Sequence, residues 1–153
     1  MEINKTVLKK VASSFSTGVT IITAKDNADM LVGMTASSFV SVSLDPPLVS
    51  FFVDNNAKLL DNIKTGDTIG ISILSSDQQN ISNHFAGYPD PEKVVEFDQS
   101  KGFPVVKSAL AWYITKVTQL TPTGDHQMVL CAVEKLGRNE DLSPLLYYSG
   151  KYL

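Results

Sequence analysis

Hydrophobic positions along the chain recur mostly at the spacing of β-strands. Alternating or continuous apolar runs of a few residues predict strands, and such runs cover 19–24, 32–44 with a break near Ala36, 48–53, 68–74, 109–120, 127–135 and 145–148. Apolar residues three and four apart predict an amphipathic helix over Thr6–Phe15. Asparagine and serine caps predict two shorter helices, over 55–63 and from Ser75 or Ser76 to Phe85.

The order of these elements indicates the fold class. The strands follow one another as hairpins and do not alternate with long helices, which predicts a mainly β, antiparallel barrel or sandwich with about three short helices. The stretch Gly87–Pro104 carries three prolines and is irregular. It predicts a surface excursion with a helical turn at 92–96, and long irregular segments in compact domains often carry function.

Composition narrows the class of protein. The 153 residues predict one domain. A formal charge of −3 without a basic excess argues against nucleic acid or an anionic membrane as a partner. The start of the chain lacks the apolar run of a signal peptide. The single cysteine, Cys131, forms no internal disulfide, and we expect a cytoplasmic protein.

The chain offers few residues for catalysis by protein groups alone. It has two histidines and one cysteine, too few for a zinc site, and no phosphate-binding or nucleophile-elbow motif. Cys131 and Trp112 lie among apolar neighbours, which favours packing roles for both. If the protein is an enzyme, a bound organic cofactor is therefore expected to supply the difficult chemistry.

The segment Gly33–Phe39 is the first informative one. Small and hydroxyl residues between two strands leave backbone N–H groups accessible, and such a break can hold a phosphate or the edge of a flat ligand. The same composition is compatible with a serine-rich edge strand that binds nothing.

Several segments, in order, resemble the flavin reductase family, the FMN-binding split barrels that include the small components of two-component monooxygenases. They are Ser16–Thr23, Gly33–Phe39, Ser41–Val49, Ile73–Gln78, His84–Phe85, Gly124–His126 and Pro144–Tyr152. The resemblance covers essentially the whole chain. It implies a mainly β, antiparallel split barrel, formed by 1–153 as a single flavin reductase-like domain.

The resemblance also implies roles for individual residues. The flavin, FMN with FAD as an alternative, would contact two groups of residues along the chain: Gly33, Met34, Thr35, Ser37 and Ser38, and then Phe52, Val53, Asp54, Lys58, His84 and Phe85. His84 stands where the family often has arginine, and a histidine lacks the permanent charge. Asp125 and His126 would bind the nicotinamide, with His126 as the catalytic residue.

The implied activity is hydride transfer from NADH or NADPH to flavin N5, which needs proximity and a water-free pocket more than an acid or base. The resemblance also implies a homodimer, and a monooxygenase or other electron acceptor for the reduced flavin. Two alternatives remain at this point. One is an electron-transfer module with tightly bound FMN reduced by a protein partner, and the other is a flavin-binding barrel without turnover.

Overall fold

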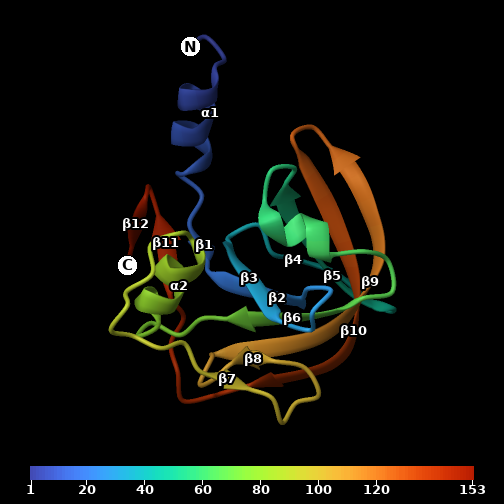
Figure 1. The fold of residues 1–153 in the computed structure, drawn as a ribbon. Coiled ribbons are helices and arrows are strands. Elements are labelled where there is room, and N and C mark those ends of the chain that lie inside the picture. Colours follow the sequence, from blue (N-terminus) through green and yellow to red (C-terminus); the bar gives the residue numbers. More distant parts are fainter.

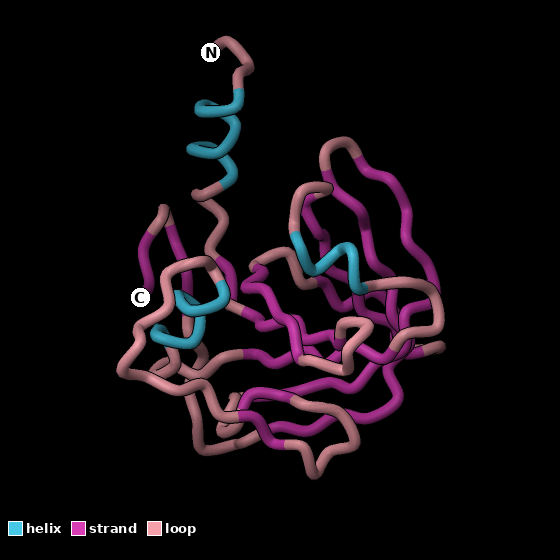
Figure 2. Tube along the Cα trace, viewed as in Figure 1, coloured by secondary structure: helices cyan, strands magenta, loops and turns pink.

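The computed structural model describes residues 1–153 and is built around one seven-stranded antiparallel sheet (Figures 1 and 2). Its strand order is β3-β2-β6-β9-β10-β5-β4. In chain order, the strands of this sheet are β2 (Thr20–Lys25), β3 (Leu31–Ala36), β4 (Val40–Leu44), β5 (Pro47–Asp54), β6 (Thr68–Ile73), β9 (Ala111–Thr123) and β10 (His126–Arg138).

The connection between β3 and β4 closes this sheet into a barrel. Only Ser37, Ser38 and Phe39 separate the two strands, yet the strands lie at opposite edges of the sheet. Three residues reach from one edge to the other only if the sheet curls until its edges approach each other. The split barrel and the antiparallel pairing expected from the sequence are thus confirmed, and a cluster of 13 buried apolar residues fills the interior.

A second apolar cluster packs on the outer face of the barrel, because β2 is buried on both sides. Ile22 points into the barrel cluster, while Ile21 points into a group with Leu74, Ile81 and Leu145. This second cluster is covered by three additions to the barrel: helix α2 (Gln79–Phe85), the short pair β7 (Phe97–Asp98) and β8 (Val105–Val106), and a small sheet. The small sheet contains β1 (Thr17–Gly18), β11 (Leu146–Tyr148) and β12 (Lys151–Tyr152).

Helix α1 (Lys5–Ala12) makes no such packing. Asn4 caps it by accepting a hydrogen bond from the Val7 N–H at 3.0 Å, as the amphipathic pattern and the polar residue before it would favour. No residue of α1 is buried, and Figure 1 shows the helix standing away from the barrel. Its apolar stripe therefore has no partner within the chain.

Three local predictions were wrong in detail. The expected helix over 55–63 is a five-residue 3₁₀ helix, η1 (Lys58–Asn62), without a side-chain cap. The expected serine cap of α2 is also absent, because the Ser75 hydroxyl donates to Asp77 and Gln78 occupies the cap position. No helical turn forms at 92–96: Glu92 lies in a turn closed by the Lys93 N–H donating to the Asp90 carbonyl, and 93–96 have no regular structure. Short polar segments have weak helical preferences, which tertiary contacts override.

The interpretation of Cys131 as packing is confirmed. Its side chain is fully buried in the barrel cluster, and burial raises the pKa of the thiol to about 11. A thiol of that pKa stays protonated at neutral pH and is a poor nucleophile. None of the helices of the protein is both long enough and apolar enough to pass through a membrane.

Candidate flavin and nicotinamide site

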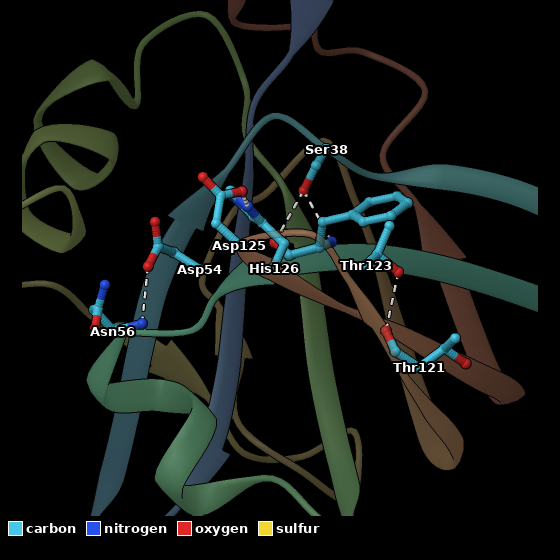
Figure 3. A network of polar contacts seen from close by, with 8 residues as sticks. Ser38, Asp54, Asn56, Thr121, Thr123, Asp125 and His126 are labelled. Carbon is cyan, nitrogen blue, oxygen red and sulfur yellow. Dashed lines mark hydrogen bonds and ion pairs between the residues drawn. The ribbon is translucent and has the colours of Figure 1, made fainter. Parts of the chain in front are cut away.

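The segment between β3 and β4 meets the end of β5 through one serine. Ser38 Oγ accepts the Phe52 N–H at 3.0 Å and donates to the Phe52 carbonyl at 3.2 Å, so a single hydroxyl replaces a missing strand partner (Figure 3). Asp54 follows at the end of β5, where its carboxylate accepts the Asn56 N–H at 2.8 Å. The two segments that the resemblance assigns to the flavin therefore lie against each other.

The turn that carries His126 lies beside the same end of β5. His126 is paired with Asp54 across the β5–β10 ladder, and the Asn55 N–H donates to the Asp125 carbonyl at 3.0 Å. His126 Nδ1 lies 2.6 Å from Asp125 Oδ1 (Figure 3). This hydrogen bond, helped by charge attraction, lowers the pKa of the Asp125 carboxyl. It fixes one ring nitrogen and leaves Nε2 without a partner in the chain.

The other end of the β3 segment contacts α2. Thr35 Oγ1 donates to the Ser82 carbonyl at 2.6 Å. The ring of Phe85 covers Gly33 so closely that a Cβ there would lie 2.8 Å from the ring. His84 follows the edge of Phe85, with ring centroids 4.8 Å apart. The site residues expected from the sequence thus form two groups, joined by β3 and the residues after it.

Two neighbouring hollows open beside the end of β3, and no residue of β5 or of the Asp125–His126 turn lines either of them. One, of about 210 Å³, is lined by Thr35, Ser37, Ser82, Ala86, Tyr147, Tyr152 and Val19. The other, of about 300 Å³, shares Ser37 and Val19 and reaches Phe15 and Phe39. Thr17 lines this second one, and its buried hydroxyl has no hydrogen-bond partner. Buried hydroxyls are rarely left unpaired, so Thr17 suits a ligand that brings a polar edge.

The donor set fits a flavin. Ser37 and Thr17 offer hydroxyls, and Phe15, Phe39 and Tyr147 offer apolar surface, the combination expected for a flat ring with a polar edge. Two side chains that the sequence suggested do not point to a ligand. Met34 packs against the barrel cluster and Val53 is fully buried in it, so only their backbone atoms can reach a flavin. Lys58 is exposed on η1 and lines neither hollow.

Sequence reasoning missed Ser82 and Tyr152 as site residues. The Tyr152 hydroxyl lies 2.7 Å from Ser82 Oγ and donates to Asn83 Oδ1 at 3.1 Å, which ties the C-terminal hairpin to α2 at the wall of the first hollow. The resemblance of Pro144–Tyr152 to the family's ending was the available signal. Ser82 had none, because it is one polar residue within an amphipathic helix.

Comparison with known proteins places the chain in a family. The model of the flavin reductase like domain matches residues 12–153, so the chain belongs to that family. It is 39% identical to an NADH-dependent flavin reductase of Rhodococcus, covering 99% of this chain and 86% of the relative. It is 35% identical to the reductase component of 4-hydroxyphenylacetate 3-monooxygenase of Thermus thermophilus, covering 97% and 95%.

Solved structures agree with this placement. The flavin reductase PheA2 superposes with a TM-score of 0.92 at 36% identity, covering 99% of this chain and 97% of that one. The NADH:FAD oxidoreductase of Streptomyces globisporus, solved in complex with NAD and FAD fragments, gives a TM-score of 0.90 at 29% identity, covering 100% and 96%. The family match and these structures confirm the resemblance noted from the sequence.

Proposed function

We propose that residues 1–153 form one domain that reduces a flavin with NADH or NADPH. The observation that carries this proposal is the convergence of Ser38, the end of β5 and His126 at one end of the split barrel. The names of the relatives support it, since they include an NADH-dependent flavin reductase and an NADH:FMN oxidoreductase. Bound flavin would supply the hydride-accepting chemistry, with FMN or FAD as the acceptor.

The residues of the chain then have binding and positioning tasks. The hydroxyls of Ser37 and Thr17, together with backbone N–H groups of 33–38, would donate to the polar edge of the flavin and stabilise negative charge there. Asp125 holds the His126 ring through Nδ1, so that Nε2 is available to bind the nicotinamide. The apolar walls exclude water, which keeps the reduced flavin from side reactions.

Hydride transfer between nicotinamide and flavin needs proximity and a water-free pocket more than a protein acid or base. The reduced flavin would then pass to a separate acceptor. One of the relatives is the reductase component of a monooxygenase, so we propose a monooxygenase as the acceptor of the reduced flavin. A dinucleotide substrate and a single, unpaired and buried cysteine are both compatible with a cytoplasmic location.

An absorbance assay with purified protein, NADH or NADPH, and added FMN or FAD tests this function. We expect nicotinamide oxidation that depends on added flavin, and bleaching of the flavin in the absence of oxygen. In His126→Ala, loss of one ligand hydrogen bond of about 1–1.5 kcal/mol should raise KM for the nicotinamide roughly 5- to 10-fold, without changing flavin affinity. Thr123→Ala, which removes an exposed hydroxyl bonded only to the Thr121 carbonyl, is the matched control.

Two results would contradict the proposal. Flavin that copurifies with the protein and is reduced by neither nicotinamide would indicate an electron-transfer module served by a protein partner. An equal rise of KM in Thr123→Ala would mean that the turn responds to any disturbance, and His126 would lose its assigned role.

We propose further that the protein is a homodimer. Helix α1 exposes Leu8, Val11 and, just beyond it, Phe15, which is 81% exposed. Strand β4, at an edge of the barrel, exposes Val40, Val42 and Leu44, which is 90% exposed. An unpaired edge strand and an unpaired apolar helix on one small protein are typical of an interface between subunits. Phe15 also lines a hollow, so the partner would complete the walls of the site.

Light scattering after gel filtration checks the dimer. The wild-type chain should elute with twice the mass of one chain, and Leu8→Glu with Val11→Glu should shift it to the monomer. The monomer should bind flavin more weakly, since it loses part of the wall. A control with Leu136→Glu, exposed on β10, should remain dimeric. A wild-type protein that is monomeric at micromolar concentration would overturn the dimer.

A further inference from the structure

The last residues of the chain form a hairpin that lies against α2 (Figure 1). In this hairpin β12 pairs with β11, Tyr147 lies opposite Tyr152, and the Leu153 N–H donates to the Leu146 carbonyl at 2.9 Å. β11 in turn pairs with β1. The rings of Tyr147 and Tyr152 meet edge to face, with centroids 5.3 Å apart. Backbone pairing and ring contact together fix where the Tyr152 hydroxyl lies.

The Tyr152 hydroxyl takes part in two hydrogen bonds with α2. It donates to Asn83 Oδ1 at 3.1 Å and lies 2.7 Å from Ser82 Oγ. A phenol has only one proton to donate, so the Ser82 hydroxyl is the donor in the second bond. Ser82 is fully buried, and its hydroxyl has no other partner in the chain. Because a buried hydroxyl without a partner is costly, the position of Ser82 depends on Tyr152.

Ser82 also contacts the segment that we assign to the flavin. Its carbonyl accepts the Thr35 hydroxyl at 2.6 Å. Tyr152 and Thr35 therefore contact the same residue of α2, one through its side chain and the other through its backbone. All three residues line the hollow of about 210 Å³ together with Ser37. Since α2 has only seven residues and no side-chain cap at its start, its position depends on tertiary contacts of this kind.

We propose that Tyr152 is a positioning residue for the flavin. Its hydroxyl holds the last turn of α2 through Ser82, and Ser82 in turn holds Thr35 and the backbone donors of 33–38 in place. Donors that bind a rigid ligand need supporting groups that fix them, because loosened donors lose affinity. The proposal rests on the flavin reductase function and adds to it a residue at the end of the chain that acts through α2.

The test removes one hydroxyl and measures flavin binding without turnover. Tyr152→Phe keeps the ring that packs on Tyr147, and Tyr148→Phe is the matched control, since Tyr148 lies in the same hairpin, is 44% exposed and makes no side-chain hydrogen bond. Fluorescence quenching gives the affinity for FMN and FAD. We expect Kd to rise roughly 5- to 10-fold in Tyr152→Phe, as for the loss of one hydrogen bond, and to stay unchanged in Tyr148→Phe. The visible circular dichroism of bound flavin should change in Tyr152→Phe alone.

A double-mutant cycle with Ser82→Ala separates positioning from direct contact with the ligand. If Tyr152 acts through Ser82, Ser82→Ala should weaken flavin binding by a similar factor, and the double variant should lose no more affinity than either single variant. Losses that multiply in the double variant would mean that each hydroxyl contacts the ligand separately, which would overturn the positioning role. An unchanged Kd in Tyr152→Phe, or an equal rise in Tyr148→Phe, would overturn it as well.

Hydrogen exchange in the flavin-free proteins tests the same contact without any ligand. The amides at 82–86 should exchange faster in Tyr152→Phe than in the wild type, while those of β9 and β10 should stay unchanged. Normal exchange at 82–86 in Tyr152→Phe would overturn the positioning role, whether or not the protein reduces flavin. A wild-type protein that binds flavin but reduces it with neither nicotinamide would overturn the reductase function alone, because the comparison of Kd values would still hold.

Discussion

Replacement of Gly33 by alanine should weaken flavin binding by one to two orders of magnitude and leave the barrel folded. The added Cβ would lie 2.8 Å from the Phe85 ring and 3.2 Å from the Ile22 carbonyl. Because Phe85 packs into the second apolar cluster against Phe97, its ring has to move together with the last turn of α2. Such overpacking costs about 1–3 kcal/mol. Here we expect the strain to shift Thr35 and Ser82 from their positions at the site.

A double-mutant cycle separates this effect from general destabilisation. Phe85→Leu removes the ring edge that meets the new methyl group, so Gly33→Ala combined with Phe85→Leu should bind flavin better than Gly33→Ala alone. Flavin fluorescence quenching gives the affinities, and urea unfolding of the flavin-free proteins gives the stabilities. Additive losses of flavin affinity across the cycle would show that contact between residues 33 and 85 does not shape the site.

The barrel was predictable because its strands have strong, separate signals. β2, β5 and β6 are rich in β-branched or aromatic residues, and proline pairs or Gly-Asp turns lie between the strands. The sheet order was not predictable from these patterns. It depends on the three residues between β3 and β4, whose reach across the barrel mouth only the folded sheet reveals. The sequence did not predict the short strands β1, β7, β8 and β12, because a strand of two residues has no hydrophobic periodicity.

The candidate site divides in the same way. Residues next to strands, such as Ser38 and His126, could be proposed from the sequence because the family motifs that contain them are local in sequence. The cavity beside His84 and Phe85 was not found, since it joins the start of β3 to the end of α2 and to an irregular loop. The sequence motifs also did not show which residues face the site with their side chains and which with their backbone alone. Met34 and Thr35 are adjacent, but strand alternation sends one into the barrel and the other toward α2.

Gly70 shows how closely the irregular excursion and the barrel depend on each other. It lies on β6, paired with Thr23 on one side and Ile114 on the other. Thr23 Oγ1 donates to the Pro104 carbonyl at 2.8 Å, across the space that a side chain at position 70 would need. The end of the 87–104 segment is thus anchored on the barrel by a backbone carbonyl that passes over a glycine.

Replacement of Gly70 by alanine should therefore destabilise the protein by about 2–4 kcal/mol, the sum of overpacking and the loss of a buried hydrogen bond. A Cβ there would lie 2.6 Å from the Pro104 carbonyl oxygen, a backbone atom that cannot rotate away. Urea unfolding should show a lower midpoint for Gly70→Ala. Gly18→Ala, where no atom lies within 4 Å of the new methyl group, should change stability by less than about 0.5 kcal/mol.

The same variant connects the barrel with the position of Phe97. If Pro104 moves away from Thr23, the strand pair β7–β8 that carries Phe97 moves with it. An unchanged urea midpoint in Gly70→Ala would mean that the Pro104 carbonyl can move aside without loss of the hydrogen bond from Thr23.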